Sequence, residues 1–310
     1  MWYYWALGGI LALALTTALV SWRLSALVIR PRREGREEAV KKEIERGNLA
    51  SGELEAMRTE EGELEATDGV KLRYLWLRCG RPTDKACVVV HGFSSRKEHV
   101  VRYAKLYLAR GYDALVYDQR NAGDSGGTIT TMGFLEKRDL QRMLHFARED
   151  KGFPQKRAVV GAHGESLGAA AVLLASCLEE PPDFAVADCP FADLTEQLRY
   201  NVTSVKHLPP YPFAPVANAI TCLRAGFRYQ DVSPLRAIEA RNGLPDVPVL
   251  FIHGEADTLI PPAASKRLYE AKRGAKELHL FPGAEHARSL FSDRARYAEI
   301  LNAFLDKCGY

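Results

Sequence analysis

The sequence lacks the cysteine patterns of metal modules and of disulfide-rich folds. No C-x-x-C pair and no histidine at ligand spacing accompanies its six dispersed cysteines, which are Cys79, Cys87, Cys177, Cys189, Cys222 and Cys308. This distribution excludes a zinc module or a disulfide framework as the basis of the fold. Scattered single thiols in a chain of this size favour a reducing compartment.

An excess of charge of one sign is also missing. Lys and Arg number 42 and Asp and Glu number 39, so the net charge is only +3. Proteins that bind nucleic acid concentrate basic residues on one face or stripe. The near-equal numbers of basic and acidic residues give no sign of such a basic surface. We therefore expect no nucleic-acid partner.

No internal repeat is visible in the 310 residues, of which 47% are hydrophobic and 26% are charged. These fractions are close to the averages of folded soluble proteins, which excludes a disordered, collagen-like or low-complexity chain. The length accommodates one large α/β domain with an appendage, or two small domains.

The N-terminal segment is a long apolar run. No side chain from Trp2 to Trp22 is charged, and aromatic residues stand at both ends, as they do at membrane interfaces. The run has about the ~20 residues that cross a bilayer core. A secretory signal would carry a basic residue before the run, whereas here the basic residues follow it, at Arg23, Arg30, Arg32, Arg33 and Arg36.

This pattern predicts an uncleaved transmembrane anchor over residues 1–30 of a single-pass protein of the cell membrane. The positive-inside tendency places the rest of the chain in the cytoplasm. A cleaved export signal and a hydrophobic helix docked onto protein are the alternatives. Residues 31–61 are dense in Glu, Lys and Arg and cannot build a core, so we predict a charged helical stalk there, with a partly disordered spacer as the alternative.

The hydrophobic pattern of the sequence changes from residue 62 onward. Gly62–Ala66 and Val70–Leu77 flank the turn sequence Thr67-Asp68-Gly69, which predicts an antiparallel hairpin at a sheet edge. Short continuous apolar runs, typical of parallel strands buried on both faces, then recur at Ala86–Val90, Ala114–Tyr117, Ala158–Ala162, Phe184–Ala187, Val249–Ile252 and Leu278–Phe281. Segments long enough for crossover helices separate them, at 98–110, 133–150, 167–178, 262–272 and 292–307.

We therefore predict an α/β domain over 62–310 whose mostly parallel sheet has helices on both faces. One interval, about 190–232, breaks the alternation and is rich in proline and aromatic residues. In open sheets of this kind ligands collect at the carboxyl ends of the strands. We interpret the interval as a cap inserted over those ends, and a surface excursion without substrate contact is the alternative.

A serine motif follows the strand predicted at 158–162. The sequence Gly164-Glu165-Ser166-Leu167-Gly168 has the form G-x-S-x-G and precedes a small, apolar helix. A serine on such a strand-to-helix turn stands exposed at the sheet edge, and the flanking glycines permit close backbone approach. The start of the helix and the amide of Leu167 would face negative charge forming beside Ser166. We predict Ser166 as a nucleophile.

A serine nucleophile needs a base, and the base needs an acid that orients it. Two loops that follow predicted strands offer them, with Asp257 as the acid and His286 as the base. The rival bases His91, His163 and His253 stand where packing and backbone hydrogen bonding are commoner roles, and Asp188 is a rival acid. Glu165 and Glu285 flank the candidates and are expected to be exposed loop carboxylates.

Stabilisation of an oxyanion requires two preorganised donors. The backbone amide of Leu167 is one candidate. The second is expected in the loop after the first parallel strand, where Val90-His91-Gly92-Phe93 places the amide of Phe93 at the strand end. A plain strand-ending turn is the alternative.

Together these residues resemble the α/β-hydrolase superfamily over about residues 62–308. The resemblance is carried by Ser166, Asp257 and His286 in that chain order, with their flanking motifs, and by His91-Gly92-Phe93 and the segment 118–125. More narrowly, the sequence is similar to membrane-anchored bacterial hydrolases of the serine-aminopeptidase-like group and to the animal ABHD-type lipid and thioester hydrolases. One departure is Asn121-Ala122, where the family often has a glycine next to the arginine. Three residues of the same segment are expected to be structural, namely Arg120, Asp124 and Ser125.

The resemblance implies an α/β-hydrolase fold with an inserted cap, preceded by a transmembrane helix, and a serine esterase mechanism without a metal or organic cofactor. We expect a small-molecule ester or acyl substrate cleaved through an acyl-enzyme. An aromatic cap and an anchor beside lipid favour apolar acyl chains, as in monoacylglycerols, lysophospholipids or acyl thioesters.

Two other functions stay open at this point. A serine aminopeptidase would need an acidic cluster in the cap to bind a free amine, and the cap offers Asp193, Glu196 and Asp231. A membrane-anchored binding protein could keep the fold without the reaction, because fold alone does not establish function.

Overall fold

The computed structural model describes residues 1–57, 59–150 and 159–310, and within these residues eight strands form one sheet. The order is β1-β2-β4-β3-β5-β6-β7-β8, antiparallel from β1 to β4 and parallel from β4 to β8. The strands are β1 Thr59–Glu65, β2 Lys71–Leu77, β3 Lys85–Val90, β4 Asp113–Tyr117, β5 Val159–Glu165, β6 Ala185–Asp188, β7 Val249–Gly254 and β8 Lys276–Phe281. The predicted edge hairpin and parallel sheet are confirmed, except that Ala158, the first residue of the predicted 158–162 strand, lies outside the described residues.

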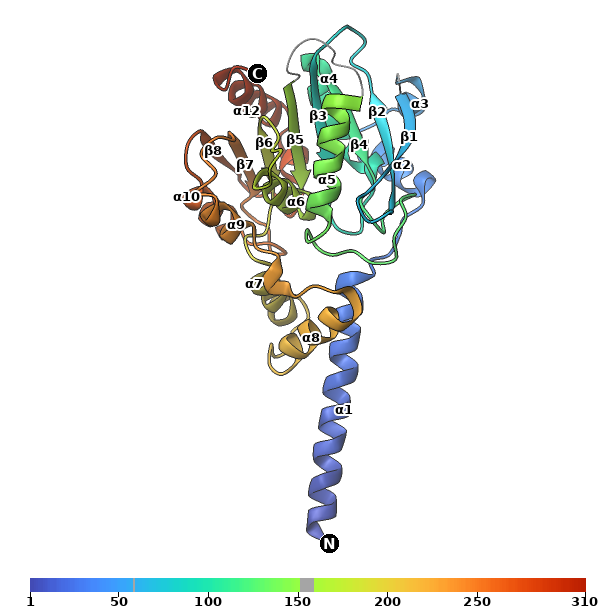
Figure 1. Cartoon of the computed structure of the whole chain (residues 1–310), viewed down its shortest axis with the longest axis vertical. Helices are drawn as coiled ribbons and strands as arrows, with labels where there is room; N and C mark the ends of the chain where they lie inside the picture. The colour runs from blue at the N-terminus through green and yellow to red at the C-terminus, as the bar shows by residue number, and fades with distance from the viewer. Residues whose placement is uncertain (58, 151–158) are drawn as a thin grey trace.

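Side chains of the central strands alternate between two cores because successive residues of a strand point to opposite faces. On β3, Val88 belongs to one core and Val89 to the other. One face is covered by α5 Glu136–His145, α6 Leu167–Ser176, α9 Pro234–Ala240 and α10 Ala263–Ala271. The other face is covered by α4 Val101–Arg110 and α12 Arg294–Lys307 (Figure 1). The prediction of helices on both faces is confirmed.

Short helical turns subdivide three of the predicted helices. The 98–110 helix begins as the 3-10 turn η1 Lys97–Val100, and α5 continues into the π-helical turn η2 Phe146–Asp150. The last helix is preceded by α11 Ser289–Ser292. It restarts at Asp293, whose side chain accepts a hydrogen bond from the amide of Arg296 and so caps α12.

The segment predicted as a stalk, 31–61, differs from that expectation. It contains helices, α2 Arg36–Glu45 and α3 Glu53–Ala56, but these do not stand away from the domain. Glu43 and Leu49 are buried, and a carboxylate oxygen of Glu43 lies 2.8 Å from Nδ1 of His99 in η1. The described part of the segment, which leaves out residue 58, is therefore an arm packed on the domain.

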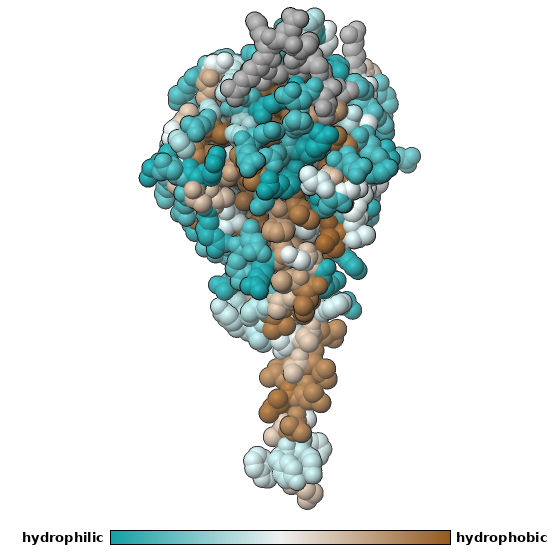
Figure 2. Space-filling view, viewed as in Figure 1, coloured by the Kyte–Doolittle hydropathy of each residue, from teal (hydrophilic) through white to brown (hydrophobic). Residues whose placement is uncertain are grey.

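Helix α1, Trp2–Ile29, projects from the side of the molecule where the inserted segment lies (Figure 1). Among the described residues it is the helix whose length and composition suffice to cross a membrane. Figure 2 shows its free part as a hydrophobic column below a largely hydrophilic domain. Its last third is different, because Ser21, Ser25 and Ile29 are buried against the protein.

The inserted interval, about 190–232, folds into α7 Leu194–Tyr200, η3 Asn201–Val205, α8 Phe213–Ala225 and η4 Tyr229–Asp231. Helix α8 packs along the end of α1. The hydroxyl of Thr221 donates a hydrogen bond to Ser25 Oγ at 2.9 Å, and that of Ser21 donates to the Phe213 carbonyl at 3.2 Å. The interval and the end of α1 thus form one structure at the carboxyl edge of the sheet.

Candidate active site

Ser166 stands on the sharp turn between β5 and α6, with φ 56° and ψ −115°. The turn demands glycine on both sides because the backbone approaches other backbone closely. A Cβ on Gly164 would lie 2.2 Å from the Gly168 carbonyl oxygen, and one on Gly168 would lie 2.3 Å from that of Val90. The sequence expectation about these glycines is confirmed, and Ser166 keeps 9% of its surface exposed.

The structure brings three predicted residues together from the ends of three strands. Ser166 follows β5, Asp257 follows β7 and His286 follows β8. Nε2 of His286 lies 2.9 Å from Ser166 Oγ, and Nδ1 of His286 lies 2.7 Å from Oδ2 of Asp257. Because a carboxylate only accepts, Nδ1 carries the proton and Nε2 is free to accept the serine proton.

Asp257 is held as a carboxylate by several donors. Burial alone would raise its pKa, but hydrogen bonds from His253 and His286 and from the amide of Ile260 lower that pKa below the ordinary value. The amides of Leu259 and Ile260 donate to Oδ1 at 2.9 and 2.8 Å, which leaves Oδ2 for the imidazole of His286. The loop after β7 therefore fixes both the charge and the orientation of the acid.

The pKa of His286 is raised above the ordinary value of 6.5. Burial works in the opposite direction, but the hydrogen bond and the charge of Asp257 outweigh it, with smaller contributions from Glu165 and Asp188. An imidazolium formed by proton transfer from Ser166 would be stabilised by these same carboxylates.

Two of the three rival histidines, His91 and His163, are engaged away from Ser166 and Asp257. His91 is buried, and its Nε2 accepts a hydrogen bond from the amide of Gln119 at 2.9 Å. His163 is enclosed between the hydroxyls of Tyr107 and Tyr297, each at 3.1 Å, and burial lowers its pKa to about 3, which keeps it neutral. These two histidines fill the packing and bonding roles that the sequence favours for them.

His253 has a role that sequence reasoning missed. Its Nε2 lies 2.9 Å from the carbonyl of Ile260 and 3.2 Å from Oδ2 of Asp257, while its Nδ1 lies 2.7 Å from Ser265 Oγ. Since both partners of Nε2 only accept hydrogen bonds, that nitrogen carries the proton. It donates to the carboxylate of Asp257 and to the carbonyl of Ile260. The sequence feature that could have indicated this contact is the i, i+4 spacing of His253 and Asp257 at the end of a predicted strand.

Asp188, the rival acid, faces away from the imidazole into a buried network. Its Oδ2 accepts hydrogen bonds from the hydroxyls of Tyr103 and Tyr297, each at 3.1 Å. Burial and the nearby charge of Glu165 raise the pKa of Asp188 to about 6. Its contribution to His286 is therefore through charge rather than contact.

The expectation that Glu165 is an exposed loop carboxylate is wrong. It is the last residue of β5 and is 6% exposed. It pairs with the guanidinium of Arg102 and accepts a hydrogen bond from the hydroxyl of Tyr103 at 2.8 Å. The two partners are adjacent residues of α4, which packs on β3 and β4. Glu165, the residue before Ser166, is therefore bound to the helix layer on the face of the sheet that α6 does not cover. Glu285 is exposed, as expected.

The two candidate oxyanion donors lie at the same place. Leu167 is the first residue of α6, where backbone amides lack helical partners, and Phe93 follows the end of β3. Both line one cavity with Ser166. The backbone beside Phe93 is close to the serine, because a Cβ on Gly92 would lie 3.4 Å from the Cβ of Ser166.

Two cavities, each of about 360 Å³, border the candidate site, one lined by Ser166 and the other by His286. The first is apolar and contains Ser166, and Lys206 is the one charged residue among the described residues that line it. The second is polar and contains His286 and Ser94. Charged side chains of both signs line it, from the arm, from η1 and α4, from β5 and from the loop after β8, namely Arg32, Glu34, Glu38, Lys42, Arg46, His99, Arg102, Glu165 and Arg288. Ser166 and His286 thus stand between an apolar and a charged compartment.

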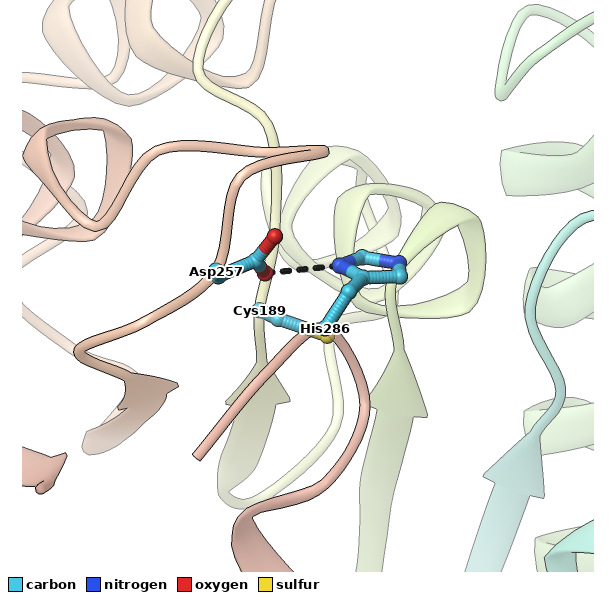
Figure 3. A group of neighbouring side chains, drawn as sticks. All are labelled: Cys189, Asp257 and His286. Carbon is cyan, nitrogen blue, oxygen red and sulfur yellow. Dashed lines mark hydrogen bonds and ion pairs between the residues drawn. The ribbon is translucent and has the colours of Figure 1, made fainter. Parts of the chain in front are cut away.

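Cys189, Asp257 and His286 offer possible metal ligands within 4.8 Å of one another (Figure 3). The figure shows the carboxylate directed at the imidazole, with Cys189 beside them. Burial and the neighbouring carboxylates raise the pKa of the Cys189 thiol well above its ordinary value. A cysteine binds a metal ion as the thiolate, which the raised pKa of Cys189 disfavours. Because Asp257 and His286 also bond each other, this set of side chains suits a proton relay better than a metal ion.

The acidic residues of the cap are all engaged within the protein. Asp193 caps α7 and pairs with Arg236 at 3.3 Å, and Glu196 pairs with Arg267. Asp231 accepts from the amide of Arg228 at 2.7 Å. None of these three carboxylates lines either of the two cavities at Ser166 and His286.

The loop after β4 is a structural element, as expected. Arg120 pairs with Asp68 and Asp139, Asp124 pairs with Arg96 and Lys97, and Ser125 donates to the Asp118 carbonyl. Asn121 adopts a left-handed conformation with φ 58°. Asparagine tolerates that region better than most residues, which explains how it stands where the family often has glycine.

Comparison with known proteins gives a consistent result. A family model described as "Alpha/beta hydrolase family" matches residues 87–300. The Bacillus subtilis protein YqkD is 34% identical over 298 residues, covering 94% of this chain and 95% of its own. The zebrafish lysophosphatidylserine lipase ABHD12 is 24% identical, over 61% of this chain and 48% of its own. The Pyrococcus furiosus esterase Pf2001 superposes with a TM-score of 0.70 at 24% identity, over 90% of this chain and 98% of its own, a likeness that concerns the fold.

Proposed function

The chain belongs to the alpha/beta hydrolase family, and on that premise we propose that it is a serine hydrolase that cleaves carboxylic esters or related acyl bonds. The observation that carries the proposal is the hydrogen-bonded series Ser166, His286, Asp257, with distances of 2.9 and 2.7 Å. A binding protein would gain nothing from holding all three groups in this geometry.

In the proposed reaction Ser166 attacks the carbonyl carbon of the substrate while Nε2 of His286 takes the serine proton. Asp257 stabilises the imidazolium through Nδ1. The amides of Phe93 and Leu167 hold the oxyanion of the tetrahedral intermediate. His286 then gives its proton to the leaving group, and water releases the acyl group from Ser166 by the same steps.

The two compartments support a substrate with one apolar and one polar part. The apolar cavity at Ser166 suits an acyl chain, and the charged cavity at His286 suits a polar leaving group. Monoacylglycerols, lysophospholipids and acyl thioesters have this form. The name of one relative, a lysophosphatidylserine lipase, agrees with this substrate class.

The chain arrangement supports a membrane location for this activity. We propose that residues 1–30 anchor the protein in the cell membrane as a single pass, that 62–310 is the hydrolase domain with the cap at about 190–232, and that this domain is cytoplasmic. The basic residues that follow the apolar run support that orientation.

Replacement of Ser166 tests the proposal. We expect Ser166→Ala to lower kcat/KM for a p-nitrophenyl ester by ~10³-fold or more and to abolish fluorophosphonate labelling. Ser204→Ala, an exposed serine of the cap, is the matched control and should behave as wild type. Full labelling of the Ser166→Ala variant would reject the assignment.

A panel of substrates separates the remaining alternatives. The aminopeptidase alternative is disfavoured because Asp193, Glu196 and Asp231 have partners within the protein. We expect acyl esters to be hydrolysed well above aminoacyl amides. Faster cleavage of aminoacyl amides would support a peptidase, and no turnover of either class would support a binding protein.

A further inference from the structure

The apolar cavity at Ser166 has an unexpected wall. Three of its lining residues, Leu24, Leu27 and Val28, belong to α1, the helix predicted as a membrane anchor. They are spaced i, i+3 and i+4 and so share one face of the helix. On the domain side the lining comes from the inserted interval, with Leu198 and Val202 among its residues, and from loops at the carboxyl ends of the strands, which contribute Phe93 and Ile260 among others. The anchor helix and the active-site serine therefore border the same space.

The end of α1 is fixed in this position by polar contacts. Thr221 donates a hydrogen bond to Ser25 Oγ at 2.9 Å, and the guanidinium of Arg224 lies 4.2 Å from the ring centre of Trp22. The carbonyl of Ile29 accepts a hydrogen bond from the amide of Thr130 at 2.8 Å. A helix that served only as a tether would need no buried serines and no such contacts.

The geometry of α1 places this cavity next to the bilayer. The residues before Ser21 are mostly exposed, and at 1.5 Å per residue 19 residues span ~28 Å, close to the ~30 Å of a hydrocarbon core. Ser21 is the first buried residue of the helix, and Leu24 follows three residues later. The apolar lining thus begins within about one helical turn of the point where α1 would leave the membrane.

We propose that α1 is part of the acyl-binding site, with Leu24, Leu27 and Val28 in contact with one hydrocarbon chain of a lipid ester. The hydrocarbon chain of the lipid passes from the bilayer into the cavity along α1 and does not cross water. Leu24 and Val28, which are half-buried, set the length of chain that fits. This inference rests on the proposed hydrolase function and adds that the anchor selects the substrate.

Substitutions at Leu24 in the full-length protein test the inference. We compare kcat/KM for p-nitrophenyl dodecanoate and p-nitrophenyl acetate, in detergent micelles, for wild type, Leu24→Trp and Leu24→Ala. Leu24→Trp fills part of the cavity and should lower the dodecanoate-to-acetate ratio of kcat/KM by ~10-fold or more, because the long acyl chain loses more space than the acetyl group does. Leu24→Ala enlarges the cavity and, in a series of p-nitrophenyl esters that extends beyond dodecanoate, should move the acyl chain length with the highest kcat/KM to a larger value. Leu11→Trp, on the exposed part of the same helix, is the control and should leave the ratio unchanged.

The outcomes separate the two proposals. Unchanged chain-length preference in both Leu24 variants, or an equal change in Leu11→Trp, would overturn the role of α1 and leave the hydrolase assignment intact. A wild-type protein that hydrolyses neither ester would overturn the hydrolase assignment itself. If Leu24→Trp does not fold, as seen by thermal unfolding, the enlarging variant Leu24→Ala decides.

Discussion

At the scale of single residues, the proposed reaction depends most on His286, which takes the proton of Ser166 and gives it to the leaving group. It contacts Asp257 directly, and the charges of Glu165 and Asp188 reach it through the protein. All three favour the imidazolium, so the pKa of His286 lies above 6.5 although burial opposes the charge. A base with a raised pKa is protonated, and inactive, over a wider acidic range.

The pH dependence of turnover follows from this direction. We expect kcat/KM to be highest above the raised pKa of His286 and to fall as the pH drops through it, with the midpoint above 6.5. Glu165→Gln removes one of the charges that raise the pKa and should move the acidic limb to lower pH. Rate profiles between pH 5 and 9 measure both.

Glu285→Gln is the control for this experiment. Glu285 is adjacent to His286 in the chain but exposed, so water screens its charge. The midpoint of the acidic limb of kcat/KM against pH should therefore be the same as in wild type. Identical profiles for wild type and Glu165→Gln would show that the buried carboxylate does not act on the base.

Residue roles differed in how far the sequence could predict them. Ser166, Asp257 and His286 each follow a strand at the same sheet edge, so motif and order predicted that they would meet. The burial of Glu165 was not predictable, because its partners Arg102 and Tyr103 stand on a helix some sixty residues earlier. The support of Asp257 by His253 likewise depends on the exact course of one loop.

At the scale of elements, the arm formed by α2 and α3 is the main departure from expectation. Apolar runs predicted the strands well, since a parallel strand buried on both faces has an unmistakable composition. The arm has no such composition, because polar pairs attach it together with only a few separate apolar residues, of which Leu49 and Leu54 are buried in one of the two cores. The carboxylate of Glu43 contacts His99 and lies 3.4 Å from the guanidinium of Arg102, and none of these leaves a hydropathy signal.

We predict that Glu43→Ala lowers the free energy of unfolding by about 3 kcal/mol, because it leaves buried partners without their carboxylate. Burial alone would raise the pKa of Glu43, but His99, Arg102 and Asn48 lower it to about 2. The stabilisation is therefore present above the ordinary glutamate pKa of 4.5 and is lost as pH falls from there toward 2. Chemical denaturation at pH 7 and at pH 3 measures the difference.

Glu37→Ala on the same helix is the matched control, since Glu37 is exposed, and it should change the stability by less than ~0.5 kcal/mol. Equal effects of the two substitutions at pH 7 would contradict the role given to Glu43.

At the scale of the whole molecule, the active site lies between an apolar helix and a charged arm. The uncharged run predicted α1, and its aromatic ends agree with interfaces at the bilayer surfaces. That its last third would also line the site was not predictable, because the contacts join Ser21 and Ser25 to a cap some two hundred residues later. The end of α1 and the cap are therefore joined in the structure, as the proposed role of α1 in substrate binding requires.

The orientation in the membrane is testable directly. We expect the full-length chain in the membrane fraction, with its domain digested by added protease in inside-out vesicles and protected in spheroplasts. A chain without residues 2–20 should appear in the soluble fraction. Digestion in spheroplasts and protection in inside-out vesicles would place the domain on the outside and contradict the orientation.

The central claim is that Ser166 is the nucleophile, and mapping of a covalent adduct tests it most directly. Full-length protein is treated with a fluorophosphonate until ester hydrolysis stops, and its peptides are analysed by tandem mass spectrometry. We predict one adduct per chain, on Ser166, formed in step with the loss of activity. An adduct on another residue, or complete inactivation with Ser166 unmodified, would contradict it.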